Sequence, residues 1–221
     1  MIPDYPIHFH PFDHQSWLHR YRTNLPHWRQ PNATYFVTFR LADSIPRSVF
    51  QQWEKEKLEW LAERGLSLSM APFPSNLPAK FRKEFEREFN RKLHSFLDGG
   101  RGTCVLRIPE AREHLEDGFR SSASTVGSYV IMPNHVHCLI TPRETDTLQK
   151  TLQLLKGGTA RRINKALGRT GKLWQRDSFD HIVRTFDHLE RYQKYNRKNP
   201  EMARLDETEY SLHIAQYTSH S

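Results

Sequence analysis

Residues 129–140 read Y-V-I-M-P-N-H-V-H-C-L-I, and this stretch decides the fold. Two runs of β-branched and apolar residues flank Pro133 and Asn134, a pair typical of a tight turn between antiparallel strands. We therefore predict one strand over residues 129–132 and a second over residues 135–141, joined as neighbours in a sheet.

His135 and His137 stand at the start of the second predicted strand. Because a strand has a period of two residues, both imidazoles project from one face, while Val136 and Cys138 face a core. Two neutral imidazoles side by side can share a divalent metal ion. Such a pair is by itself more often structural, but its place beside a turn leaves it within reach of a ligand.

Outside this hairpin, the sequence alternates strand-like and helical segments. Tyr35–Leu41 is rich in β-branched and aromatic residues and predicts a strand, and Leu173–Arg184 predicts an extended segment. Helical patterns cover Ser48–Arg64, Pro78–Leu97, Pro109–Phe119, Thr147–Leu167 and Asp187–Lys198. This order is typical of an α+β protein, and we expect a ferredoxin-like antiparallel sheet with helices on one face.

We expect one domain over residues 1–221, interrupted by a single insertion. Residues 46–108 hold two charged helical segments and predict a helical insertion after the first strand. Residues 1–32, rich in Pro, His and Trp, predict an irregular arm, and residues 121–127 predict a loop.

The charge balance points to an acidic partner. The 221 residues include 33 Lys and Arg against 25 Asp and Glu, a net charge of +8, and the isoelectric point is about 9.6. Such a balance is typical of nucleic-acid-binding proteins. Cys104 and Cys138 are far apart and form no zinc or disulfide pattern, so we expect a reducing cytoplasm. Neither a signal peptide nor an apolar run of membrane-spanning length is expected.

The positive charge is concentrated in residues 147–176, which contain no acidic residue. A run of one sign has no internal pairing, and a phosphate backbone supplies the missing counter-charge. Trp174 and Phe179 lie close by and either stack on unpaired bases or belong to the core. The cations predicted to bind DNA are Lys150, Lys156, Arg161, Arg162, Lys165, Arg169, Lys172 and Arg176.

The last predicted helix, residues 187–198, has recognisable ends. Asp187 and Glu190 have the spacing of a capping box at its start, and we expect Pro200 to end it. An end there would leave the last side chains of the helix free to turn towards a neighbouring site.

Two tyrosines on this helix each have an asparagine one turn later. Tyr192 precedes Asn196 and Tyr195 precedes Asn199 by four residues, so each pair shares a helix face. In the second pair, the amide oxygen could join two histidines on a metal while the phenol lies within reach of it. Helical tyrosines are by default packing residues, so this pattern alone is weak.

Together these residues resemble the single-tyrosine HUH transposases (histidine, hydrophobic residue, histidine), and within them the REP-associated tyrosine transposases. The resemblance spans most of the chain and is weakest in the helical insertion. The segments that carry it are L-P-H-W-R-Q-P-N-A-T-Y-F-V-T-F-R-L-A-D-S at 25–44, Y-V-I-M-P-N-H-V-H at 129–137, L-W-Q-R-D-S-F-D-H-I-V-R at 173–184 and Y-N-R-K-N-P at 195–200.

The resemblance implies an enzyme that cuts and rejoins single-stranded DNA near hairpins through a covalent 5′-phosphotyrosine intermediate. By position, His135, His137 and Asn199 match the metal ligands, and Tyr195 matches the nucleophile. Imidazole and amide ligands beside phosphate suit Mg²⁺ or Mn²⁺. The expected partner is single-stranded DNA with hairpins, bound by a monomer or a homodimer. Tyr192 is a second tyrosine that the family pattern does not require.

Two other functions remain open at this point. The first is a non-catalytic nucleic-acid-binding module, which would bind DNA without forming an adduct. The second is a metallo-hydrolase that uses water as its nucleophile. It would need further metal ligands besides the two histidines, and Asp180 and His181 are the nearest candidates.

Overall fold

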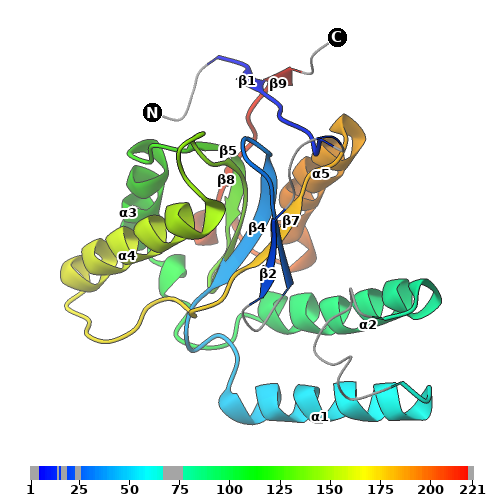
Figure 1. Cartoon of the computed structure of the whole chain (residues 1–221). Helices are drawn as coiled ribbons and strands as arrows, with labels where there is room; N and C mark the ends of the chain where they lie inside the picture. The colour runs from blue at the N-terminus through cyan, green and yellow to red at the C-terminus, as the bar shows by residue number, and fades with distance from the viewer. Residues whose placement is uncertain (1–4, 14, 16–18, 23–25, 67–76, 219–221) are drawn as a thin grey trace.

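The computed structural model describes residues 5–13, 15, 19–22, 26–66 and 77–218. At its centre is a five-stranded sheet in the order β7-β4-β6-β5-β8, with every neighbouring pair antiparallel (Figure 1). The α+β class and the antiparallel sheet are therefore confirmed. The strands are β4 (Tyr35–Arg40), β5 (Thr125–Ile131), β6 (His135–Thr141), β7 (Phe179–Ile182) and β8 (Ser211–His213).

Helices α3 (Pro109–Arg120) and α4 (Leu148–Ala166) complete a ferredoxin-like β-α-β-β-α-β order with strands β4 to β7. Both helices pack on one face of the sheet, against alternate strand residues such as Val37 and Val136. Helix α5 (Phe186–Met202) covers the opposite face (Figure 1). The expectation of helices on one face thus holds for α3 and α4 but not for α5.

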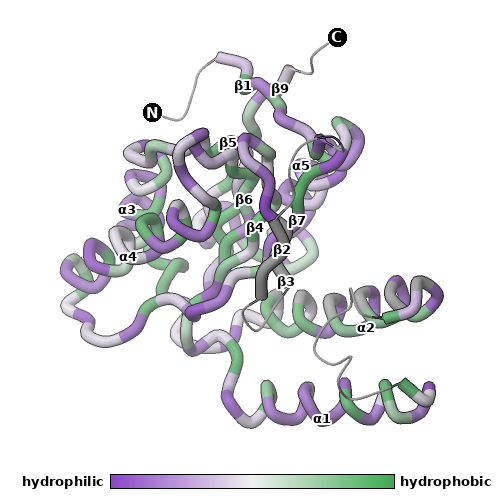
Figure 2. The backbone as a smooth tube through the Cα atoms, viewed as in Figure 1, coloured by the Kyte–Doolittle hydropathy of each residue, from purple (hydrophilic) through white to green (hydrophobic). Residues whose placement is uncertain are grey.

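The reason lies in the burial of the central strands. Along β6, Val136, Cys138 and Ile140 contact the α3–α4 side, while Leu139 faces the other way and packs with α5. A strand that is apolar on both faces needs cover on both. Figure 2 shows hydrophobic segments gathered along these central strands.

Residues 46–108 contain α1 (Arg47–Glu63), α2 (Ala79–Asp98) and the short 3-10 helix η3 (Val105–Arg107). Helices α1 and α2 share an aromatic cluster in which the rings of Trp60 and Phe85 lie 5.2 Å apart. An ion pair between Lys92 and Glu56 also joins the two helices. Both helices were predicted, and they lie away from the two layers that cover the sheet (Figure 1).

The N-terminal segment is more regular than its composition indicates. Strand β1 (Ile7–His8) pairs in parallel with β9 (Tyr217–Thr218). Strands β2 (His19–Arg22) and β3 (Pro26–Arg29) form an antiparallel pair. The prediction of an irregular arm was wrong for these residues, because such short strands depend on partners rather than on local periodicity.

Three predicted boundaries were also wrong. Strand β5 starts at Thr125, because the expected loop around residue 127 is a bulge inside the strand. Helix α5 is capped by Thr185, whose hydroxyl accepts from His188 N, rather than by a capping box at Asp187. Pro200 lies within α5 instead of ending it, since a proline in the last turn forfeits only one backbone hydrogen bond.

Among the residues described, no helix is both long enough and apolar enough to cross a membrane.

Candidate active site

His135 and His137 lie at the start of β6, on the face of the sheet that α5 covers. Both are fully buried at 0% exposure, and their ring centroids are 4.7 Å apart. The antiparallel pairing with β4 sets Arg40 opposite His135 and Thr38 opposite His137. Directly opposed residues project from the same face, so these four side chains share one surface.

Asn134, in the turn before β6, orients His135. Its side-chain Oδ1 is 2.8 Å from His135 Nδ1. Its Nδ2 donates to Leu97 O at 3.1 Å and to Arg101 O at 3.0 Å, which fixes which end of the amide faces the imidazole. His135 Nδ1 must therefore carry the proton, and Nε2 carries the lone pair.

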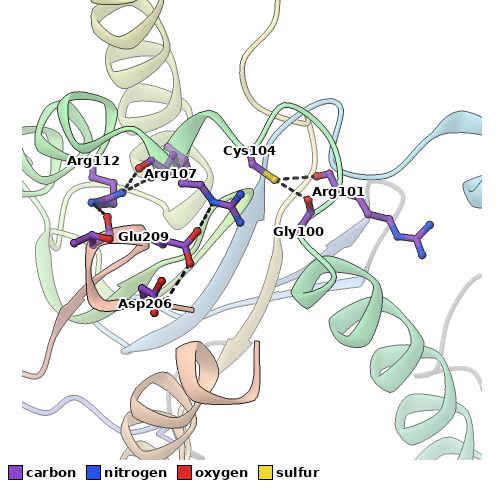
Figure 3. Close-up of polar contacts among 9 residues, drawn as sticks. Gly100, Arg101, Cys104, Arg107, Arg112, Asp206 and Glu209 are labelled. Atoms are coloured by element: carbon purple, nitrogen blue, oxygen red, sulfur yellow. Dashed lines mark hydrogen bonds and ion pairs between the residues drawn. The ribbon is translucent and has the colours of Figure 1, made fainter. Parts of the chain in front are cut away.

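The loop after α2 that receives Asn134 is itself held in place. Cys104 Sγ donates to Gly100 O at 2.9 Å and approaches Arg101 O at 3.6 Å (Figure 3). The helical segment 46–108 thus reaches the site indirectly, through the carbonyl oxygens that hold Asn134. The Pro133-Asn134 turn was predicted from the sequence, but this role of the asparagine was not.

His137 is oriented by β4. Thr38 Oγ1 lies 2.6 Å from its Nδ1, and the ring stacks on Phe36 at 5.6 Å between centroids. With Nδ1 occupied in this way, Nε2 faces α5. There the hydroxyl oxygen of Tyr195 lies 3.5 Å from His137 Nε2.

A stripe of α5 residues faces this surface, with the spacing of three and four residues that defines one side of a helix. The stripe contains Leu189, Tyr192, Tyr195, Asn196 and Asn199. Tyr192 stacks on Phe36 at 4.1 Å and 10° between planes, so its ring is a packing element, and burial raises the pKa of its phenol. Of the two tyrosines, Tyr195 is the one whose hydroxyl the structure brings to the histidines.

The side-chain amides of Asn196 and Asn199 are buried, and neither has a hydrogen-bond partner within the described part of the chain. Buried amides normally have partners, so such groups suit a ligand. Asn199 was predicted as a metal ligand, whereas Asn196 was noted only as the asparagine that follows Tyr192 by one turn. No cluster of three His, Cys, Asp or Glu residues that could hold a metal occurs among the described residues. A metal bound by His135 and His137 would thus take an amide oxygen as its third protein ligand, which fits these asparagines.

Asp180 and His181, the further ligands that a water-using hydrolase would need, do not complete this site. Asp180 lies opposite Val37, on the other face of the sheet from the histidines, and forms a buried ion pair with Arg29. His181 lies opposite Phe36, two strands away from β6. The arrangement therefore favours Tyr195 as the nucleophile over a water bound to a metal that Asp180 and His181 help to hold.

The predicted DNA-binding cations lie on and after α4, on the opposite side of the sheet from α5. Three of them line a groove of about 540 Å³ between α4 and the segment that leads into β7: Lys156, Lys172 and Arg176. Lys156 Nζ donates to Arg176 O and Ser178 Oγ at 2.8 and 3.0 Å. Burial, reinforced by repulsion from Lys172, lowers the pKa of Lys156 to about 8.

The remaining cations are spread around the helix. Lys150, Arg161 and Lys165 are exposed on α4, and Arg169 follows it. Arg162 lies on the side of α4 that contacts α3, close to Gly118. Trp174 is a core residue, since its ring packs against Phe39 and its Nε1 donates to Thr159.

Comparison with known proteins agrees with the family predicted from the sequence. Residues 107–198 match the model of the IS200-like transposase family. The matched segment includes both histidines and Tyr195, and it stops one residue before Asn199. A search of curated proteins gave no match.

Two solved structures were matched at low sequence identity and low TM-score. One is a REP-associated tyrosine transposase bound to a REP hairpin, at 15% identity and a TM-score of 0.42, covering 82% of this chain and 72% of the other. The second is an inferred transposase from Deinococcus radiodurans R1, at 12% identity and a TM-score of 0.34, covering 77% and 91%.

Proposed function

We propose that the chain is a transposase that cleaves and rejoins single-stranded DNA near hairpins, with Tyr195 as its nucleophile. The observation that carries this proposal is the 3.5 Å separation between the Tyr195 hydroxyl and His137 Nε2, above a pair of buried imidazoles. A tyrosine hydroxyl beside two imidazoles is the arrangement that an attack by a phenol on a metal-bound phosphate needs. The match of residues 107–198 to the IS200-like transposases supports the same conclusion.

The proposed reaction conserves the energy of the phosphodiester bond. The Tyr195 phenol oxygen attacks phosphorus, and the bond from phosphorus to the 3′ oxygen breaks. The phenolic proton is transferred, overall, to that leaving oxygen, which becomes a 3′-hydroxyl. A 5′-phosphotyrosine link remains, and a 3′-hydroxyl can reverse the step with the phenolate as leaving group.

The residues that would hold a divalent metal are His135, His137 and Asn199, through two Nε2 atoms and an amide oxygen. Bound Mg²⁺ or Mn²⁺ would offset the negative charge that develops on the phosphate. Asn134 and Thr38 contact the two Nδ1 atoms and so hold the rings with Nε2 directed at the site. Asn196, buried beside the same face, is a second amide available there.

The deciding experiment incubates the full chain with a hairpin-bearing single-stranded oligonucleotide and Mn²⁺. A denaturing gel then reports any covalent protein–DNA band. We expect a band that EDTA abolishes, with a free 3′-hydroxyl on the released fragment. Binding without an adduct would favour the non-catalytic module, and cleavage without an adduct would favour the water-using hydrolase.

A further inference from the structure

One charged residue shares the histidine surface, and it lies within the segment 25–44 that carries the family resemblance. Arg40 is the last residue of β4, and the strand register sets it directly opposite His135. Side chains opposed in this way have Cβ atoms roughly 4.5–5.5 Å apart. The Cβ of Arg40 therefore lies beside that of His135, at the end of the surface that Tyr195 approaches through His137.

The charge of Arg40 is poorly compensated. Its side chain is half-buried, and its guanidinium donates to the neutral Ser44 hydroxyl at 3.3 Å. None of the carboxylates in the described residues lies within ion-pair distance of it. Burial lowers the pKa of Arg40, while the more distant Asp177 opposes this shift. A guanidinium remains protonated even so, and a half-buried cation of this kind has the environment of an anion site.

A second observation links Arg40 to the basic groove. Repulsion from Arg40 contributes to the lowered pKa of Lys156, which lines the groove beside α4. The backbone agrees, because Gln175 N donates to Arg40 O and Leu41 pairs with Trp174. Positive charge thus continues from the groove, around the end of β4, to the histidine pair.

On this basis we infer that Arg40 is a further catalytic residue, whose guanidinium binds the non-bridging oxygens of the phosphate that Tyr195 attacks. A planar fork of donors suits two phosphate oxygens at once. This inference rests on the proposed strand-transfer function. Negative charge increases on those oxygens during the attack, so the contact strengthens in the transition state.

The test compares Arg40→Met, Arg40→Lys and an exposed control on α2, Arg91→Met. Each folded variant, checked by circular dichroism, is assayed for single-turnover adduct formation and for DNA affinity on one hairpin oligonucleotide. We expect Arg40→Met to slow the adduct by roughly 100-fold to 1000-fold with little change in Kd. Arg40→Lys should retain part of the rate, and Arg91→Met should match wild type.

A second substrate removes the charge instead of the arginine. A methylphosphonate at the mapped scissile position should slow the wild type but make no further difference to Arg40→Met. Equal rates for Arg40→Met and wild type on the normal substrate would overturn the inference. So would an Arg40→Met variant that slows adduct formation on the methylphosphonate as much as it does on the normal phosphodiester. In both cases an intact wild-type adduct leaves the proposed function standing. A wild type that forms no adduct overturns the proposed function and this inference together.

Discussion

At the scale of single residues, the site depends on which nitrogen of each imidazole keeps its lone pair. An amide oxygen only accepts, so Asn134 forces the His135 proton onto Nδ1. The Thr38 hydroxyl contacts His137 Nδ1 and orients that ring, although a hydroxyl can either donate or accept and so does not set the tautomer. Asn134 and Thr38 thereby direct both rings at the surface that α5 covers, and the two anchoring residues matter as much as the rings.

This dependence predicts the effect of Asn134→Ala. The change removes the acceptor for His135 Nδ1, so the ring can rotate or change tautomer and Mn²⁺ affinity should fall about 10-fold to 100-fold. Isothermal titration with Mn²⁺ measures this without any DNA. Asn164→Ala, which removes an amide that donates to Gly171 O beyond α4, is the matched control and should leave affinity unchanged. Unchanged affinity in Asn134→Ala would refute this role.

The two tyrosines of α5 are predicted to differ sharply. Tyr195→Phe removes the hydroxyl that lies 3.5 Å from His137 Nε2, so the adduct should disappear while DNA binding persists. Tyr192→Phe keeps the ring that stacks on Phe36 and should retain most activity. Gel assays of both variants measure this. The reverse pattern would make Tyr192 the nucleophile, and cleavage by the double variant would support a water-using hydrolase.

At the scale of elements, the bulge in β5 fixes the position of α5. Ser128 Oγ accepts from Gln193 Nε2 at 2.8 Å and from Ala215 N at 3.0 Å. Gln193 Nε2 also donates to Ala215 O at 2.8 Å. Because Gln193 is two residues before Tyr195, these bonds tie the helix to the sheet and to the C-terminal segment close to the nucleophile.

The other anchor of the C-terminal segment is Arg112 of α3. Its guanidinium donates to Leu106 O and Arg107 O on one side, and to Thr208 O and Ser211 Oγ on the other. Figure 3 shows this cluster beside the ion pair of Arg107 with Glu209. The turn after α5 and strand β8 are thereby fastened to α3.

The bulge also makes a prediction about stability. A Cβ at Gly127 would lie 1.9 Å from the Tyr217 hydroxyl oxygen, so Gly127→Ala must displace Tyr217 and strand β9. We expect a loss of about 1–3 kcal/mol in the free energy of unfolding, measured by urea denaturation. The control is Gly157→Ala in α4, where an added Cβ would have no neighbouring atom of the described residues within 4 Å. That change should stabilise by about 0.5–1 kcal/mol, and similar results for both variants would contradict the argument.

How much of this the sequence could predict varies with the range of the interactions. The β5–β6 hairpin and helices α1 to α4 were predicted because their periodicity is local. The partner strands β8 and β9 were missed, since each has only two or three residues and no pattern of its own. Tyr195 was recognised through the family resemblance, since its spacing from Asn199 is shared by Tyr192 and Asn196. The roles of Thr38 and Arg40 became visible only through strand register, and that of Asn134 only through its hydrogen bonds.

At the scale of the whole molecule, the basic groove and the site lie on different layers. The groove is bounded by α4, whereas Tyr195 projects from α5 across the sheet. A DNA strand in contact with both must pass around the end of β4, where Arg40 lies. Only part of the acid-free stretch would then touch DNA, since Arg162 faces α3 instead.

The salt dependence of DNA binding tests this path. Lys172→Gln with Arg176→Gln removes two cations from the groove, and should reduce the slope of log affinity against log salt by about 0.7 for each phosphate that is no longer neutralised. Lys150→Gln with Lys165→Gln removes two exposed cations of α4 that do not line the groove, and serves as the matched pair. If both double variants show the same slope of log affinity against log salt, the DNA does not follow the groove.

The same path makes affinity depend on pH through Lys156. In the free protein its pKa is lowered to about 8 by burial, so the side chain is mostly neutral above that pH. A phosphate in the groove favours the ammonium and raises the pKa again. Binding above pH about 8 therefore requires proton uptake, and single-stranded DNA affinity should fall as pH rises through that range at fixed ionic strength. Lys156→Arg keeps its charge and should bind with a flat profile when both proteins are followed by fluorescence anisotropy. If the two proteins lose affinity in parallel, the titrating group is not Lys156, and the DNA does not enter the groove beside it.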